Sequence, residues 1–321
     1  MKTIHDYKDF PASIRTSVTI GNFDGLHMGH REVLKKLVMV ARQSGTRSVL
    51  VTFTPHPLQI LHPEKSPKSI LLQADKIERI GKMGIDYLLN LKFDLAFSKM
   101  SGESFIREIL AGALHAKYIL VGQNFVFGHK RSGNFELLER LGHELDYTIE
   151  IIKPVSVRGN RVSSTWIRQL IQSGKISMAN RLLGSYYRVS GAIIPGDGIG
   201  QKYLYPTLNL NPENEILPKI GVYVTQVTIH GKEFPAVTNV GVRPTVSGKT
   251  LRIETHLIQH QLNSTPTSME IAFLHRLREE MKFHSTEALK EQIGKDVRRA
   301  IRFFERLEYF RKSRLTNLKP T

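Results

Sequence analysis

This chain of 321 residues lacks cysteine, long apolar runs and a balancing share of acidic residues. The absence of cysteine excludes a disulfide framework and a thiolate metal site. No run reaches the roughly 18 apolar residues that indicate a membrane-spanning helix. Residues 1–10 also lack the apolar segment of a signal peptide. We therefore expect no membrane association and a cytoplasmic location.

The shortage of acidic residues leaves the chain strongly basic, with 46 Lys and Arg against 29 Asp and Glu and a formal net charge of +17. Such a charge suits an anionic ligand such as a nucleotide, and it also suits nucleic acid. Residues 285–321 contribute ten basic and five acidic side chains, a pattern typical of a solvated helix face. No zinc finger or RNA-recognition aromatic pattern is visible, so nucleic acid is the less favoured partner.

The chain is long enough for two domains, and its pattern changes near residue 185. Up to that point, apolar runs of strand length alternate with segments of helical spacing, which predicts an α/β domain with a doubly wound parallel sheet over residues 1–185. Residues 186–321 begin with short β-branched segments punctuated by Gly and Pro, which predicts an all-β unit. The expected strands are residues 48–53, 87–91, 118–121 and 147–155, the expected helices are residues 31–43, 71–83, 101–114, 135–145, 286–293 and 295–310, and a turn-rich loop is expected over residues 191–200.

The central motif is SVTIGNFDGLHMGH, residues 17–30, in which an apolar run leads through a glycine-rich turn into a helix. A helix N-terminus offers free N–H groups and a favourable dipole to phosphate. Gly21, Gly25 and Gly29 allow a bulky ligand to approach the backbone. His27 and His30 can donate hydrogen bonds to a phosphoryl group that gains charge in a transition state. The alternative is that two histidines on a first helical turn are structural or bind a metal.

Three later segments have the composition of ligand-binding loops. Residues 54–57, TPHP, place a histidine in a stiff loop at a strand end, where α/β sheets bind ligands. Residues 122–134 combine glycines, aromatic rings and cations, which suits a planar ligand that carries a phosphate. Residues 161–168, RVSSTWIR, bring three hydroxyls and an arginine to a helix start, a second phosphate-binding pattern. The structural alternatives are a plain turn for the first segment and a helix N-cap for the third.

Together these strings resemble the bacterial FAD synthetase family, within the nucleotidyltransferase superfamily whose signature is His-x-Gly-His. The resemblance implies a Rossmann-like domain that transfers AMP from ATP to FMN, giving FAD and pyrophosphate, with Mg²⁺ shared among the phosphates. It implies catalytic roles for His27 and His30. The flavin-binding residues that it implies are His56, Asn124, Phe125 and Arg161. The residues that it implies for ATP and phosphate binding are Gly21, Asn22, Phe23, Asp24, Gly25, Gly29, Ser163, Ser164, Thr165 and Arg168.

The second half resembles the riboflavin kinase module, which implies a β-barrel with C-terminal helices and the conversion of riboflavin to FMN by ATP. Thr207 and Asn209, in Pro-Thr-Leu-Asn, match the residues that serve Mg²⁺ and ATP in that family. Glu254 matches the position of the general base that takes the ribityl hydroxyl proton. The chain departs from the family's pattern at Leu204 and in residues 257–264, which contain no acid.

These departures leave other hypotheses open. One is an FMN adenylyltransferase whose C-terminal barrel is a non-catalytic module that binds flavin or RNA. Another is a nucleotidyltransferase with a different acceptor, because His-x-Gly-His alone does not name the acceptor. The favoured hypothesis has ATP, FMN and riboflavin as small-molecule partners, and the sequence leaves the oligomeric state open.

Overall fold

The computed structural model describes residues 1–195, 205–245, 248–262 and 264–316. Contacts divide the chain into two compact units, residues 1–164 and 165–321. Helices α6 (Ser164–Gln172) and α7 (Ile176–Leu183) lie between this division and residue 185, where the domain boundary stays a prediction. Helix α7 ends at Gly184, whose φ of 66° suits a glycine C-cap.

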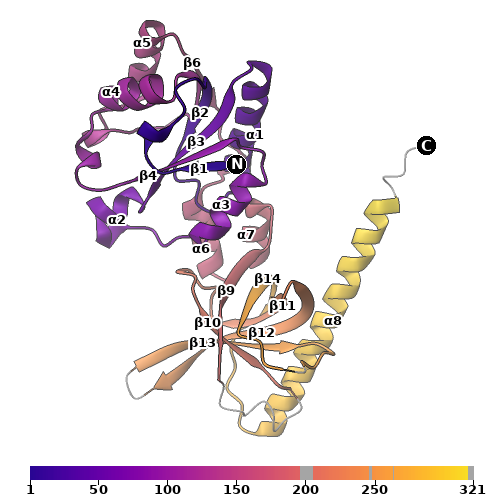
Figure 1. Ribbon diagram of the computed structural model, residues 1–321. Coiled ribbons are helices and arrows are strands. Elements are labelled where there is room, and N and C mark those ends of the chain that lie inside the picture. Colours follow the sequence, from indigo (N-terminus) through magenta and orange to yellow (C-terminus); the bar gives the residue numbers. More distant parts are fainter. Residues whose placement is uncertain (196–204, 246–247, 263, 317–321) are drawn as a thin grey trace. The chain divides into compact units, whose positions relative to one another are not determined.

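The first unit is built on a six-stranded sheet in the order β1-β4-β3-β2-β5-β6 (Figure 1). Its strands are β1 (Lys2–Ile4), β2 (Thr16–Ile20), β3 (Arg47–Thr54), β4 (Tyr87–Lys92), β5 (Ala116–Gly122) and β6 (Thr148–Ile152). All neighbouring strands pair in parallel. The inner strands are continuous apolar runs because both faces of the sheet are covered. The predicted doubly wound α/β class is confirmed, and the strand order reverses between β2 and β5.

Helices cover both faces of this sheet. One face packs against α1 (Met28–Gln43) and α3 (Gln73–Gly81) through buried leucine and isoleucine side chains. The other face packs against the π-helix η4 (Phe105–Ala113) and against α5 (Phe135–Leu145). The shorter elements of this unit are η1 (Tyr7–Asp9), α2 (Pro57–Leu61), η2 (Pro63–Lys65), η3 (Phe97–Lys99), α4 (Gly102–Ser104), η5 (His129–Arg131), β7 (Ser156–Val157) and β8 (Asn160–Arg161).

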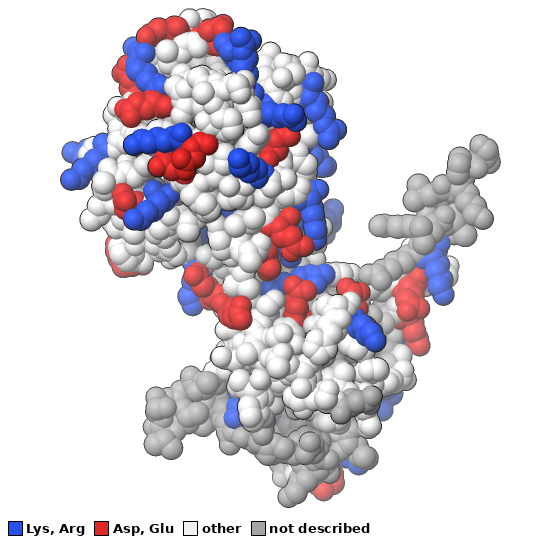
Figure 2. Space-filling view, in the orientation of Figure 1, with Lys and Arg blue, Asp and Glu red and all other residues white. Residues whose placement is uncertain are grey.

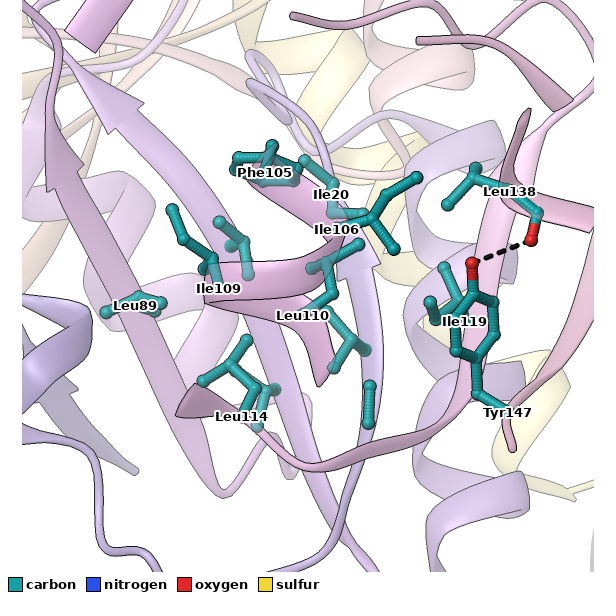
Figure 3. Packing of buried hydrophobic residues seen from close by; sticks show 14 of the residues in the cluster. Ile20, Leu89, Phe105, Ile106, Ile109, Leu110, Leu114, Ile119, Leu138 and Tyr147 are labelled. Carbon is teal, nitrogen blue, oxygen red and sulfur yellow. Dashed lines mark hydrogen bonds between the residues drawn. The ribbon is translucent and has the colours of Figure 1, made fainter. Parts of the chain in front are cut away.

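Segment 101–114 differs from the single α-helix that its spacing predicts. Ser101 is the N-cap, because its hydroxyl accepts the backbone N–H of Ser104 at 2.9 Å. From Phe105 onward the helix is of the π type, in which hydrogen bonds span five residues rather than four. The wider turn brings Phe105, Ile109 and Leu114 into one buried face that packs on the sheet (Figure 3). Burial of this face stabilises the less common helix type.

The second unit contains a closed six-stranded barrel in the order β10-β13-β12-β11-β14-β9, with antiparallel neighbours. Its strands are β9 (Tyr187–Ile194), β10 (Leu208–Pro212), β11 (Gly221–Ile229), β12 (Lys232–Thr245), β13 (Gly248–Leu257) and β14 (Ser268–Arg278). Closure leaves no open sheet edge. The fully buried hydroxyls of Thr225, Thr238 and Thr255 are joined by hydrogen bonds of 2.7 and 2.9 Å. The barrel implied by the riboflavin kinase resemblance is confirmed.

Residues 191–194, the first part of the expected turn-rich loop, belong to strand β9 instead. Gly191 lies within strand β9, opposite Pro212 of β10. A Cβ at this position would lie 1.9 Å from the carbonyl oxygen of Asn211, so the glycine permits close strand pairing rather than a turn. Residues 196–200 of the expected loop lie outside the described residues, and so does Leu204.

One continuous helix, α8 (Thr286–Thr316), replaces the two helices predicted for the end of the chain. The predicted break fell at Gly294, but a glycine inside a helix costs only about 1 kcal/mol relative to alanine. Val297, Ala300 and Ile301 pack against the barrel, and their burial offsets that cost. Within the described ranges, α8 included, no helix is both long and apolar enough to cross a membrane.

Candidate active sites

The first candidate site lies at the carboxyl edge of the parallel sheet, beside the point where the strand order reverses. In α/β sheets, ligands bind in the crevice beyond the strand ends at this point. The histidine turn, residues 21–30, follows β2, while residues 54–57 follow β3 and residues 122–134 follow β5. Strands β3 and β5 are the two neighbours of β2, so three segments far apart in the sequence meet at one edge.

The backbone holds the first part of the histidine turn in a tight conformation. The Gly21 N–H donates to the carbonyl oxygen of Val51 at 3.0 Å, which ties the turn to β3. Phe23, Gly25 and Leu26 have left-handed φ angles of 49°, 81° and 42°, a conformation that only glycine adopts without strain. The Phe23 ring is buried in the core with residues of α1, so Phe23 can face a phosphate only through its backbone.

Asp24 has a structural role in the histidine turn. Its carboxylate accepts hydrogen bonds from the backbone N–H groups of Ile70, at 3.0 Å, and Leu71, at 3.4 Å. Its carbonyl oxygen accepts a hydrogen bond from the Ser164 hydroxyl at 2.9 Å. These bonds fix the turn to the segment before α3 and to Ser164, the last residue of the first unit. The phosphate contact expected of Asp24 stays a prediction.

His27 and His30 form a stacked pair at the start of α1, with ring centroids 3.7 Å apart and ring planes at 15°. His27 is the N-cap of the helix, since its Nδ1 accepts the His30 N–H at 3.3 Å. The proton of its neutral ring therefore lies on Nε2, which is a donor. Gly29 permits this arrangement, because a Cβ there would lie 3.2 Å from Cε1 of His27.

Both histidines are neutral near pH 7. Burial lowers the pKa of His27 to about 4, a backbone hydrogen bond opposes this shift, and the charge of Arg161 adds to it. Burial also holds the pKa of His30 well below its usual range, and electrostatic interactions with His27 and Lys76 add to that shift. Nδ1 of His30 is buried and has no hydrogen-bond partner among the described residues. The pair can therefore donate N–H groups to an anion without being protonated.

His56 lies against the histidine turn. Its Nε2 is 2.9 Å from the side-chain amide nitrogen of Asn22. Its Nδ1 accepts the Leu58 N–H at 3.1 Å and so caps helix α2. A residue predicted to bind flavin is thus in contact with one predicted to bind phosphate, across 34 positions of sequence.

The loop after β5 places Phe125 in a stack of aromatic rings. Phe125 is half-buried and nearly parallel to Phe127, with centroids 5.2 Å apart and planes at 19°. Phe127 packs on the core and covers Gly133, where a Cβ would lie 2.6 Å from the ring. Phe127 is therefore structural, and Phe125 presents a flat apolar surface of the kind that suits a planar ligand ring. Asn124, next to it, is exposed.

The second predicted phosphate-binding segment divides between the two compact units. Arg161 ends strand β8 and is exposed. Ser163 and Ser164 are half-buried residues of the first unit. Thr165, which is exposed, and Arg168, which is half-buried, belong to the second unit, so their contacts with ATP phosphates stay a prediction.

The second candidate site is a row of polar residues across three adjacent barrel strands. Glu254 of β13 pairs in register with Asn209 of β10 on one side and with Asn239 of β12 on the other. Residues directly opposite each other in a sheet share a face, so these side chains form one row. Asn209 is buried, and Thr207, just before β10, is exposed. Arg252 pairs with the Glu254 carboxylate at 3.6 Å.

Sequence reasoning missed two polar residues of these sites. The side-chain oxygen of Asn239 is buried and has no hydrogen-bond partner in the described part of the chain. Lys76 of α3 is buried, with its Nζ donating to Oγ1 of Thr52 at 3.3 Å. Lys76 lies four positions before Ile80 on the same side of its helix, but this spacing alone does not distinguish it from an exposed lysine.

The surface charge of the first unit is mixed. Figure 2 shows Lys and Arg side chains interspersed with Asp and Glu side chains over the described residues of this unit's visible face. That face carries no continuous basic stripe among the described residues, although such a stripe is the usual footprint of nucleic-acid binding.

Comparison with known proteins gives one matching family for each half of the chain. The FAD synthetase family matches residues 10–166, and the riboflavin kinase family matches residues 183–304. A bifunctional riboflavin kinase/FMN adenylyltransferase of Buchnera aphidicola subsp. Schizaphis graminum is 35% identical over 308 residues, which cover 95% of this chain and 98% of that protein. The protein of the same name from Escherichia coli K12 is 33% identical over 288 residues, covering 89% and 92%.

A solved structure is similar over nearly the whole chain as well. It is named as a macrolide-efflux protein from Streptococcus pneumoniae, and it matches with a TM-score of 0.83 at 29% identity, covering 92% of this chain and 96% of that one. Two family matches in sequence order, together with relatives of more than 30% identity over almost the full length, show that the chain belongs to the bifunctional riboflavin kinase/FMN adenylyltransferase family.

Proposed function

We propose that this chain makes FAD in two steps, phosphorylating riboflavin to FMN in the barrel and transferring AMP from ATP to FMN at the edge of the parallel sheet. The observation that carries the second step is the neutral pair His27 and His30, stacked at a helix N-terminus where the strand order reverses. The observation that supports the first step, riboflavin phosphorylation, is the row of polar residues around Glu254.

In the adenylyl transfer, a phosphate oxygen of FMN attacks the α-phosphorus of ATP, and pyrophosphate leaves in line. The substrate supplies the nucleophile, so the protein positions the reactants and stabilises the developing charge. Nε2–H of His27 donates to an oxygen that gains charge. The cap bond to Nδ1 fixes this tautomer before the substrate binds, so no reorganisation is needed during the reaction.

The remaining residues of this site hold the two substrates. The flat face of Phe125 accepts the isoalloxazine ring, and Arg161 offers a charge to the FMN phosphate. Ser164, Thr165 and Arg168 hold the pyrophosphate as it leaves. The Ser164 hydroxyl donates to the carbonyl oxygen of Asp24 at 2.9 Å, so this serine is attached to the histidine turn.

In the kinase step, Glu254 takes the proton from the ribityl hydroxyl as its oxygen attacks the γ-phosphorus of ATP, and ADP leaves. Arg252 holds the carboxylate in place. Thr207 and Asn209 offer the hard oxygen atoms that Mg²⁺ accepts, and the unpartnered oxygen of Asn239 lies in the same row, so these residues fit the ion. When bound, Mg²⁺ neutralises charge on the phosphates.

The test supplies the full-length chain with ATP, Mg²⁺ and either riboflavin or FMN, and separates the flavin products by chromatography. FMN and FAD formed from riboflavin would support both steps. FAD from FMN without any product from riboflavin would mean that the barrel is silent and that the departures in residues 257–264 matter. No FAD from FMN would overturn the adenylyl transfer and indicate another acceptor.

A further inference from the structure

Lys76 is a buried lysine of the first unit that has no role in the reaction proposed above. The residue is 7% exposed, and its Nζ donates one hydrogen bond, to Oγ1 of Thr52 at 3.3 Å. An ammonium group has three donors. Among the described residues no carboxylate lies within ion-pair distance of it, so two of its donors have no protein partner there. A buried charge with unpaired donors costs free energy of folding unless a ligand accepts hydrogen bonds from those donors.

Thr52 places this ammonium group at the first candidate site. Thr52 follows Val51 on β3, and the carbonyl oxygen of Val51 accepts the N–H of Gly21 at the start of the histidine turn. Burial lowers the pKa of Lys76 and the charge of Asp24 raises it. The charge of Lys76 also lowers the pKa of His30, as a smaller cause than burial and His27. The charge of Lys76 therefore acts on the histidine turn at His30.

The protein groups nearby do not satisfy the ammonium. The Asp24 carboxylate is bonded to the backbone N–H groups of Ile70 and Leu71. His30 presents a second unsatisfied group, because its Nδ1 is buried and also has no partner in the described part of the chain. A group rich in anionic oxygens beside the turn would satisfy the ammonium, and a phosphate is such a group.

We propose that Lys76 is a catalytic residue of the adenylyl transfer and donates to a phosphate oxygen of ATP held at the histidine turn. The inference rests on the proposed function of this site. Lys76 keeps its protons throughout, while the bond from the α-phosphorus to pyrophosphate breaks and the bond to the FMN oxygen forms. A flexible ammonium with rotatable donors can follow an oxygen that moves during an in-line transfer.

The experiment compares wild type with Lys76→Met, which removes the charge and keeps the length of the side chain. We expect kcat/KM for ATP in FAD formation from FMN to fall about 10-fold to 100-fold, the range for a hydrogen bond to a charged group. Riboflavin phosphorylation by the same sample is the internal control and should not change. Lys82→Met is the matched control, because Lys82 is an exposed lysine on the C-cap of the same helix, paired with Glu78.

A purely structural lysine would give a different result. In that case Lys76→Met would lower the melting temperature and reduce both activities through loss of folded protein, or it would leave kcat/KM for ATP unchanged, and either result would overturn the proposal. Replacing a buried charge by an apolar side chain of similar size is often neutral or stabilising, so we expect an unchanged or raised melting temperature. Lys76→Gln is the second neutral variant if Lys76→Met does not fold.

Failure of the proposed function is distinguishable from failure of this inference. If wild type forms no FAD, the adenylyl transfer itself is wrong. Isothermal titration with inorganic pyrophosphate and Mg²⁺ then still compares wild type with Lys76→Met without turnover. Weaker binding by the variant alone would support an anion contact at Lys76, and equal binding would refute it.

Discussion

His27 has an observed role as a helix cap and a proposed role as a donor to phosphate, and two substitutions can separate them. Nδ1 caps helix α1 by accepting the His30 N–H at 3.3 Å, while Nε2–H is the donor proposed to act on phosphate. His27→Ala removes the cap and the donor. His27→Asn keeps a side-chain oxygen that can cap the helix but removes the imidazole donor, since asparagine is among the preferred N-cap residues.

The magnitudes follow from these contacts. Loss of an N-cap costs about 1 kcal/mol of unfolding free energy, and loss of a stacked ring pair costs about another 1 kcal/mol. His27→Ala should therefore be destabilised by about 2 kcal/mol and His27→Asn by about 1 kcal/mol. Loss of one donor to a developing oxyanion lowers kcat by about 100-fold to 1,000-fold, and this loss should be the same in both variants.

Urea unfolding measures the free energy of unfolding of His27→Ala and of His27→Asn. Chromatography of FAD formed from FMN at saturating ATP measures kcat. The reasoning predicts that stability recovers in His27→Asn whereas activity does not. A kcat within 10-fold of wild type in His27→Ala would refute the donor role. Recovery of kcat in His27→Asn along with stability would mean that the ring acts only as a cap.

Four further predictions follow from individual contacts. Burial lowers the pKa of His27 to about 4 in the folded chain, whereas the unfolded chain takes up a proton on this residue below about pH 6.5. The free energy of unfolding, measured by urea titration, should therefore fall by about 2 kcal/mol between pH 6.5 and pH 5, and by less in His27→Asn. Glu254→Gln should abolish FMN formation from riboflavin and leave FAD formation from FMN intact in the same flavin assay. Phe125→Ala should raise KM for FMN several-fold in steady-state kinetics without changing KM for ATP, because it removes one ring of a stack. Gly102→Ala should lower the melting temperature by several degrees, because its Cβ would lie 2.5 Å from Cα of Gly133.

The histidine turn could be predicted from sequence because its parts are contiguous. One strand end, one turn and one helix start supply the glycines and both histidines within ten residues. Such a motif is local, so the sequence indicates its geometry, while the chemical roles of its residues stay predictions. The α/β class could be predicted for a similar reason, since strands and helices alternate along the chain and each is a local pattern.

Features that depend on packing could not be predicted. The sequence ADKIERIGK around Lys76 resembles an ordinary charged helix surface, and only the packing of α3 buries that lysine. The π-helix after Phe105 is stabilised by contacts with the sheet. The continuity of α8 through Gly294 depends on packing against the barrel, which outweighs a local preference of about 1 kcal/mol.

The barrel site has a different architecture, and this bears on whether the kinase is active. Its residues come one from each strand, and strand register brings Asn209, Glu254 and Asn239 into one row. Thr255, next to Glu254, is fully buried and bonded to Thr238 at 2.9 Å. A slip of one residue would expose Thr255 and bury the carboxylate, so the threonine bonds hold the row in place. Residues 257–264, which lack the acids of the family's pattern, begin at the end of β13 and outside this row, so the row around the proposed general base forms without them.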